Sequence, residues 1–124
     1  MATQQLSIEQ IATKLVDYCR KGEWEKAQKE LYADDVISIE PYATEDFAIE
    51  TKGLKAIIEK GHKFQGLVVE MHSLEVSEPL TASNSIAFVM TMDVTMKKHG
   101  RMKMPEICVY DVKDGKIVSE QFHI

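Results

Sequence analysis

The stretch from Leu67 to Ile124 most constrains the fold, because its alternating pattern and its turn signals predict one antiparallel meander. Two turns are legible, Lys98-His99-Gly100 and Lys113-Asp114-Gly115. Side chains on alternate positions of a strand share one face, and here that face is apolar and rich in methionine. We therefore expect a curved sheet that encloses a pocket against other elements. The face comprises Ile86, Phe88, Met90, Met92, Val94, Met96, Met102, Met104, Cys108 and Tyr110.

The part of the chain before Leu67 is predicted to be mainly helical. Ser7 and Gln10 form a capping-box pattern, which starts a helix that runs to about Arg20. Apolar residues at helical spacing continue this prediction. We expect a second helix over 23–32, a strand over 36–39, a loop over 41–52, and a third helix that begins near Gly53 and exits between Gly61 and Gly66.

Length, charge and cysteine usage narrow the class of protein. The 124 residues fit one domain, 1–124, and the net charge of −5 argues against a nucleic-acid or anionic membrane surface. No apolar run approaches the ~20 residues that cross a bilayer. The start Met-Ala-Thr-Gln-Gln lacks the pattern of a signal peptide, so we expect a cytoplasmic protein. Cys19 and Cys108 form no disulfide or metal-binding motif and are expected to be reduced packing residues.

The first turn sets the pairing of the two strands beside it. A three-residue loop with Gly100 in the left-handed position pairs Lys97 with Arg101. Counting back, Met92 then faces Glu106 and Met90 faces Cys108. The opposite face carries Ala87, Val89, Thr91, Ile107 and Val109.

The second turn allows two registers. If Asp114-Gly115 is a two-residue turn, Glu106 faces His123; if Lys113 belongs to a three-residue turn, Glu106 faces Phe122. We favour the three-residue turn, because it gathers Val118, Phe122 and Ile124 on the methionine face. Glu120 then faces Cys108 on that same side of the sheet.

The remaining strand, over 67–77, brings a histidine to the same side. His72, Leu74 and Val76 alternate on one face, and pairing Val76 with Ile86 places His72 beside Met90. The predicted inner face therefore holds His72, Glu106 and Glu120 among apolar side chains.

A carboxylate among apolar side chains can serve as a base. Burial raises its pKa, and a second carboxylate nearby raises one of the pair further. Such a group can abstract a proton next to a carbonyl while a neighbouring acid stabilises the oxyanion. We expect Glu106 as the base, Glu120 as the second acid and His72 as a hydrogen-bond donor. The ligand-binding candidates are Tyr18, Met90, Met92 and Phe122.

Structural roles explain the same residues as readily. Glu106 follows Pro105 and could sit at a solvent-facing bulge, Glu120 could pair with a lysine, and a lone histidine such as His72 is commonly a core or rim residue. The four histidines lack metal-ligand spacing, and the sequence has no phosphate loop or nucleophile elbow. We expect no cofactor and no metal.

Several segments resemble the SnoaL-like branch of the nuclear transport factor 2-like (NTF2-like) superfamily. The resemblance implies an α+β cone, in which three N-terminal helices pack in the concave face of a strongly bent, mixed, mostly antiparallel sheet. It also implies a deep pocket and a homodimer, as well as kinship with polyketide cyclases, ketosteroid isomerase and dehydratases. Asp93 is nearest in type to a catalytic aspartate of those enzymes, but our register puts it on the outer face. The matching segments are 31–41, 51–57, 76–80, 92–95, 112–118 and 120–124.

Two hypotheses about function follow. The first is a cofactor-independent pocket protein that binds a small, largely apolar molecule and acts as an isomerase or cyclase. The second is a non-catalytic ligand-binding or protein-interaction module whose pocket is filled by Phe64, Met90 and Phe122. In both, the apolar outer face, with Val89 and Ile107, is expected to be covered by a second copy of the chain.

Overall fold

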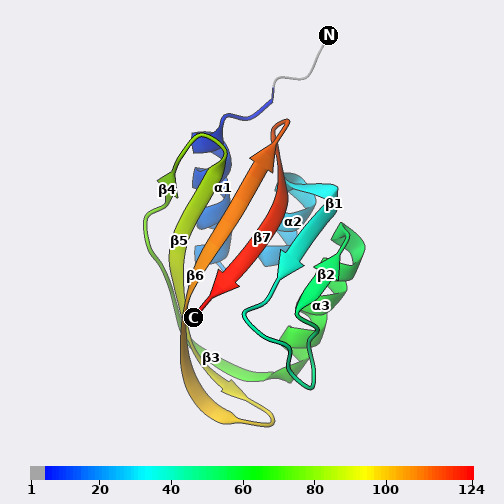
Figure 1. Ribbon diagram of the computed structural model, residues 1–124. Coiled ribbons are helices and arrows are strands. Elements are labelled where there is room, and N and C mark those ends of the chain that lie inside the picture. Colours follow the sequence, from blue (N-terminus) through cyan, green and yellow to red (C-terminus); the bar gives the residue numbers. More distant parts are fainter. Residues whose placement is uncertain (1–4) are drawn as a thin grey trace.

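The computed structural model describes residues 5–124, and part of the N-terminal start discussed above, residues 1–4, lies outside them. These described residues form an α+β fold with three helices and a seven-stranded sheet (Figure 1). The α+β fold class predicted from the sequence is confirmed. The elements are α1 (Ile8–Arg20), α2 (Trp24–Leu31), β1 (Tyr32–Ile39), β2 (Glu50–Lys52), α3 (Leu54–Leu67), β3 (Val68–Val76), β4 (Leu80–Thr81), β5 (Ser85–Met96), β6 (Gly100–Lys113) and β7 (Lys116–His123).

The sheet is mixed, with the strand order β2-β1-β7-β6-β5-β3 and with β4 paired to β5. β1 and β7 run parallel, whereas the other pairs are antiparallel. Figure 1 shows the helices gathered on one side of the sheet, while β3 and the tip of the β5–β6 hairpin curve away at one end. The helices therefore pack against the sheet to which the long meander contributes most strands.

The helices form largely where the sequence pattern predicts. Ser7 accepts from the Gln10 amide at 3.1 Å and its own amide donates to the Gln10 side chain at 2.8 Å, so the capping box is present. The buried stripe of α1 includes Ile11, Leu15 and Cys19. α3 differs from expectation, because it continues through Gly61 and Gly66 to Leu67. None of the helices within residues 5–124 is long and apolar enough to cross a bilayer.

The β5–β6 register differs from the predicted one by two residues. Met96 lies opposite Gly100, so Lys97-Lys98-His99 forms the connection and Met90 lies opposite Glu106. The predicted pairing of Met92 with Glu106 is therefore wrong. An offset of two keeps every side chain on its predicted face, because the side-chain period of a strand is also two.

The β6–β7 connection is the two-residue turn, so the predicted three-residue turn is wrong. Asp114 and Gly115 have φ values of 52° and 76°, which suit a two-residue hairpin whose central residues are both left-handed. Val112 pairs with Ile117, but the next pair is Asp111 with Ser119, so β7 has a bulge with one extra residue between these two pairs. The two-residue turn alone would put Glu120 and Phe122 on the outer face of the sheet. The extra residue, Val118, returns both to the inner face.

This bulge decides which β7 side chains face the helices. Beyond it, Tyr110 lies opposite Glu120 and Cys108 lies opposite Phe122, so Glu120 is on the inner face. Ile117 is fully buried, whereas Ile124 is 74% exposed. The expectation that Val118 and Ile124 join the methionine face is therefore wrong, although Phe122 does pack against the core.

Candidate functional site

A buried carboxyl group on β7 is the centre of a polar network on the inner face of the sheet. Glu120 is 4% exposed, and its Oε1 accepts a hydrogen bond from the Tyr32 hydroxyl at the start of β1. Its Oε2 accepts from the Ser38 hydroxyl, further along β1, at 2.7 Å. Burial raises the pKa of Glu120, and the two hydroxyl donors oppose that rise. Both oxygens of this buried group are therefore satisfied by neighbouring strand residues.

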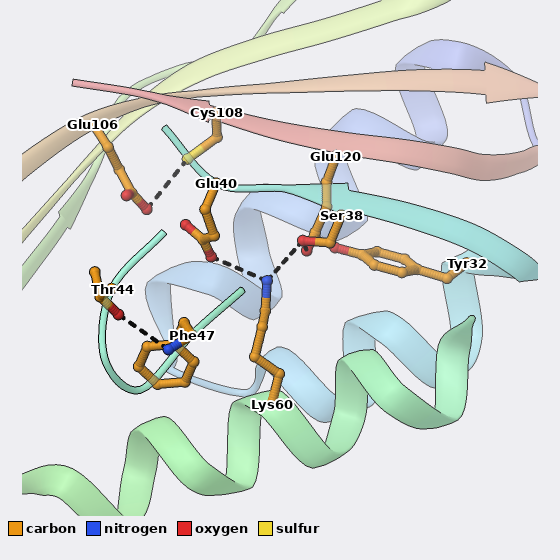
Figure 2. A network of polar contacts seen from close by, with 9 residues as sticks. All are labelled: Tyr32, Ser38, Glu40, Thr44, Phe47, Lys60, Glu106, Cys108 and Glu120. Carbon is orange, nitrogen blue, oxygen red and sulfur yellow. Dashed lines mark hydrogen bonds and ion pairs between the residues drawn. The ribbon is translucent and has the colours of Figure 1, made fainter. Parts of the chain in front are cut away.

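The network continues to a lysine on α3. Lys60 Nζ donates to Ser38 Oγ at 2.8 Å and forms an ion pair with Glu40 Oε1 at 3.0 Å. Only 16% of the Lys60 side chain and 25% of the Glu40 side chain are exposed. The ammonium group also lies 5.8 Å from the ring centroid of Phe122. Figure 2 shows Lys60 reaching from α3 toward Ser38 and Glu40. A cation is thus held where the network approaches solvent.

Glu106 on β6 is the second half-buried acid of this region. Burial raises its pKa to about 7, and the negative charge of Glu40 adds to the rise. The charge of Glu120 acts in the same direction, whereas Lys60 lowers the pKa. The Cys108 thiol donates to Glu106 Oε1 at 3.8 Å, which also favours the ionised form. A carboxyl group with this pKa is partly ionised at neutral pH and can both accept and return a proton.

The segment between β1 and β2 passes beside this region, as Figure 2 shows for Thr44 and Phe47. The Phe47 amide donates to Thr44 Oγ1 at 3.0 Å, and the Thr44 amide donates to the Phe47 carbonyl at 2.8 Å. Lys98, at the tip of the β5–β6 hairpin, pairs with Glu45 at 2.7 Å and with Asp46 at 3.0 Å. The segment between β1 and β2, which the sequence predicts to be a loop, is thus attached to the hairpin tip by these ion pairs.

Of the three proposed catalytic residues, Glu120 lies in this network, and Glu106 lies on the next strand, where its side chain contacts Cys108. Glu106 and Glu120 come from neighbouring strands, and the charge of Glu120 raises the pKa of Glu106. His72 does not join them: its Nε2 lies 2.7 Å from Thr95 Oγ1, and its Nδ1 lies 3.0 Å from Glu70. A bulge between Met71 and Ser73 displaces His72 from the predicted alternation. The predicted placement of His72 beside Met90 is wrong, because Met90 pairs with Val76.

The proposed ligand-binding residues are likewise divided. Met90 and Met92 are 7% and 8% exposed on the inner face, and Phe122 lies under Lys60. Tyr18 is turned elsewhere, because its hydroxyl donates to Glu30 Oε1 at 2.5 Å between α1 and α2. That glutamate also pairs with Lys14 at 2.9 Å. Tyr18 therefore belongs to a separate surface cluster.

The sequence reasoning missed four members of the network: Tyr32, Ser38, Glu40 and Lys60. Two signals could have pointed to them. Ser38 is a polar residue inside an otherwise β-branched strand, and Lys60 follows the buried Ile57 by three positions, which places it near the same helix face. Their convergence on Glu120 depends on the parallel pairing of Ser38 with Glu120, which no local pattern shows.

Two surface hollows beside α1 do not coincide with this network. One of about 730 Å³ lies between the start of α1 and the β6–β7 turn, where Ser7, Asn84 and Asp114 are among its lining residues. It contains none of the predicted site residues. A ligand pocket on the inner face therefore stays a prediction.

A mixed, curved sheet with the helices on one side is the arrangement that this chain shares with solved NTF2-like α+β proteins. Within that class, the chain belongs to the SnoaL-like domain family, whose model matches residues 6–124. The family predicted from the sequence is therefore confirmed. A search of curated proteins gives no match.

Solved structures agree with this assignment. A protein from Mesorhizobium loti, provisionally named a SnoaL-like polyketide cyclase, is 31% identical with a TM-score of 0.88, covering 96% of this chain and 100% of its own. An NTF2-like protein of unknown function from Burkholderia pseudomallei is 16% identical with a TM-score of 0.75, covering 94% and 88%. A protein from Rhodopseudomonas palustris, provisionally named an isomerase, is 10% identical with a TM-score of 0.67, covering 97% and 90%. The chain is thus similar in sequence to the provisionally named cyclase from Mesorhizobium loti, whereas the other two matches show a shared fold.

Proposed function

We propose that this protein is a cofactor-independent acid–base catalyst that moves a proton in a small, largely apolar carbonyl compound, as an isomerase or a cyclase does. One observation carries the proposal. Glu106 is a half-buried carboxyl group whose pKa is raised to about 7 beside the Lys60–Glu40 ion pair. A base with a pKa near the working pH is ionised often enough to react and still binds a proton well.

The proposed step follows from the positions of these two groups. Glu106 takes a proton from the carbon next to the carbonyl, the C–H bond breaks, and its electron pair moves to the carbonyl oxygen. The ammonium group of Lys60 stabilises the oxyanion by donating a hydrogen bond. Glu106 then returns the proton to another carbon in an isomerisation, or the enolate carbon attacks a second carbonyl in a cyclisation.

The surroundings support an apolar substrate. Met90 lies directly opposite Glu106, and Phe122 lies beneath Lys60. Thioether and aromatic side chains adapt to apolar ligands of varied shape. The name given to the Mesorhizobium loti protein points to the same chemistry, at 31% identity over the length of both chains.

Two further expectations belong to this proposal. Cys19 and Cys108 are free and buried, which suits a reducing, cytoplasmic setting. Val89 and Ile107 lie opposite each other on the outer face and are 41% and 49% exposed, which suits burial between two copies of the chain. The second copy would leave the inner face free for the substrate.

A non-catalytic binding or interaction module is the alternative, and one observation favours it. Lys60, Ser38 and Glu120 already satisfy one another by hydrogen bonds, as a purely structural network would. The experiment must therefore measure proton transfer itself.

Deuterium exchange at the carbon next to the carbonyl of 2-tetralone, an apolar bicyclic ketone, tests the function. Proton NMR in D₂O should show exchange that the wild-type protein accelerates and that Glu106→Gln slows by about a hundredfold or more. Glu75→Gln is the matched control, because Glu75 is an exposed glutamate on β3. Exchange that is equal in the wild type and Glu106→Gln would leave the binding module as the better explanation.

A further inference from the structure

We infer that Ser38 is a proton relay between the buried Glu120 and Lys60, so that Glu120 replaces a proton that Lys60 gives to the substrate. The inference rests on the proposed function. It makes Ser38 a positioning residue and Glu120 a proton reservoir, neither of which touches the substrate. It thereby extends the reaction from an oxyanion that Lys60 merely stabilises to one that Lys60 protonates.

The geometry forms an unbroken hydrogen-bonded path. Lys60 Nζ donates to Ser38 Oγ at 2.8 Å, and the same hydroxyl donates to Glu120 Oε2 at 2.7 Å. A hydroxyl that accepts one hydrogen bond while donating another can pass a proton by exchanging the two. Figure 2 shows the three side chains in this sequence, with Lys60 from α3 on one side of Ser38 and Glu120 from β7 on the other.

Burial restricts where the proton of Glu120 can go. Ser38 is 0% exposed and Glu120 is 4% exposed, so the solvent does not compete for either group. The other oxygen of Glu120 is bonded to Tyr32, whose own pKa lies well above its usual value because the ring is buried. Tyr32 therefore keeps its own proton, and the proton of Glu120 can move only toward Ser38. Only Lys60, at the far end of the path, reaches partial exposure, with 16% of its side chain accessible.

Groups on every neighbouring element influence Glu120. Burial raises its pKa first, and the Glu40 charge adds to the rise; Lys60 and the two hydroxyl donors oppose it. A carboxyl group with a raised pKa holds a proton over more of the pH range and can serve as a store. The titratable and charged groups around it are Tyr32 of β1, Glu40 just after β1, Lys60 of α3, Cys19 of α1, and Glu106, Cys108 and Tyr110 of β6.

The step balances in protons and electrons. Lys60 gives one proton to the enolate oxygen, so its N–H bond breaks and a neutral amine remains. Once Lys60 is a neutral amine, the Ser38 hydroxyl turns toward it and its proton passes to the nitrogen, while Glu120, protonated on Oε2, gives that proton to Ser38. Glu120 is left ionised and Lys60 is again an ammonium ion, and the path resets when the enol returns its proton through Lys60.

Ser38→Ala and Ser38→Thr separate a relay from a packing role. Threonine keeps the hydroxyl and suits a β-strand, whereas alanine removes the hydroxyl but leaves both charged groups in place. In the 2-tetralone exchange assay, Ser38→Ala should lower kcat about tenfold or more with little change in KM, and Ser38→Thr should restore it. The pH profile should keep its Glu106 limb near 7 in every Ser38 variant. An unchanged kcat in Ser38→Ala would overturn the relay.

A second measurement needs no turnover. In the wild type, the Lys60 ¹³Cε resonance should show a step at the same pH midpoint as the Glu120 ¹³Cδ resonance. That step should shrink by at least half in Ser38→Ala and persist in Ser38→Thr and Glu106→Gln. A step that keeps its full size in Ser38→Ala would mean that charge acts through space alone, and the relay would be rejected.

The two measurements separate the proposals. If the wild type does not accelerate exchange but the Lys60 step depends on the Ser38 hydroxyl, the proposed function fails and the relay stands as a property of the network. If exchange depends on Glu106 but the step ignores Ser38, the function stands and the relay fails. Should Ser38→Ala not fold, Ser38→Cys serves in its place, because a thiol nearly matches the hydroxyl in shape and is a weak donor.

Discussion

Met90 and Glu106 lie directly opposite each other on β5 and β6, so a carboxyl group shares the inner face of the sheet with a buried methionine. Burial is the largest cause of the raised pKa of Glu106, and the Glu40 charge is the second. The buried position of Glu106 on the inner face therefore raises its pKa from the ordinary value to about 7.

Stability should fall as the pH rises from about 4.5 to about 7. Glu106 holds its proton more tightly in the folded state, with a pKa of about 7 against an ordinary value of 4.5, so ionising it costs stability across this window. The expected loss is about 2–3 kcal/mol, and Glu120 adds to it in the same direction. Urea unfolding at pH 5 and pH 8 measures it. Glu106→Gln should reduce the difference, whereas Glu75→Gln should keep it; equal pH dependence in both variants would contradict the assignment.

Tyr32→Phe should destabilise the protein more than Tyr18→Phe. Both tyrosines donate to a glutamate, but Tyr32 and Glu120 are buried whereas the Tyr18–Glu30 pair is only partly buried. Removing the Tyr32 hydroxyl leaves a buried oxygen without a donor, which costs about 1–3 kcal/mol. Loss of the Tyr18 hydroxyl should cost less, because Glu30 keeps its ion pair with Lys14. Thermal unfolding with circular dichroism compares the two, and similar losses would show that the buried network is not tightly hydrogen-bonded.

Two glycine-to-alanine changes should have opposite signs. Gly115 has a φ of 76°, and a Cβ there would meet Gln5 at 3.0 Å, so Gly115→Ala should cost about 1–2 kcal/mol. Gly61 lies inside α3 with nothing within 4 Å of an added Cβ, so Gly61→Ala should stabilise by about 0.5–1 kcal/mol. Chemical denaturation of both variants gives the two free energies of unfolding. A harmless Gly115→Ala would argue against the two-residue β6–β7 turn.

The outer face of the sheet should mediate a homodimer. Lysines at both Val89 and Ile107 would put two like charges on facing strands and should shift the protein to monomer, while leaving the fold intact because both side chains are exposed. Light scattering after size exclusion measures the mass. Ile49→Lys is the control, because Ile49 is equally exposed at 50% but lies outside the sheet. A wild type that is monomeric at every concentration would refute this interface.

Local pattern determined the elements and the faces. The Ser7–Gln10 capping box starts α1 where predicted, and the alternation of apolar residues assigns Met90 and Met92 to the inner face, where both are buried. The same alternation leaves Val89 and Ile107 on the outer face, where both are exposed. These features depend on residues near one another in the sequence, so the sequence contains the information that sets them.

The pairing of the strands and the grouping of the site residues depended on contacts that the local sequence pattern does not encode. A two-residue shift of β5 against β6 leaves the alternation unchanged, so no count of apolar residues distinguishes Met90 from Met92 as the partner of Glu106. Bulges likewise add one residue at positions that the sequence pattern does not predict. The bulge in β3 places His72 away from the site, whereas the bulge in β7 keeps Glu120 on the inner face.

The sequence by itself therefore determined the α+β class, the SnoaL-like family and the inner position of Glu106, whereas the inner position of Glu120 depended on the bulge between β6 and β7. Only the tertiary structure decided that Tyr32 and Ser38 meet Glu120 and that Lys60 meets Ser38, because β1 pairs in parallel with the last strand and α3 packs against β1. A hydrogen bond needs its two groups within about 3 Å, and only the folded chain brings residues so far apart in sequence to that distance.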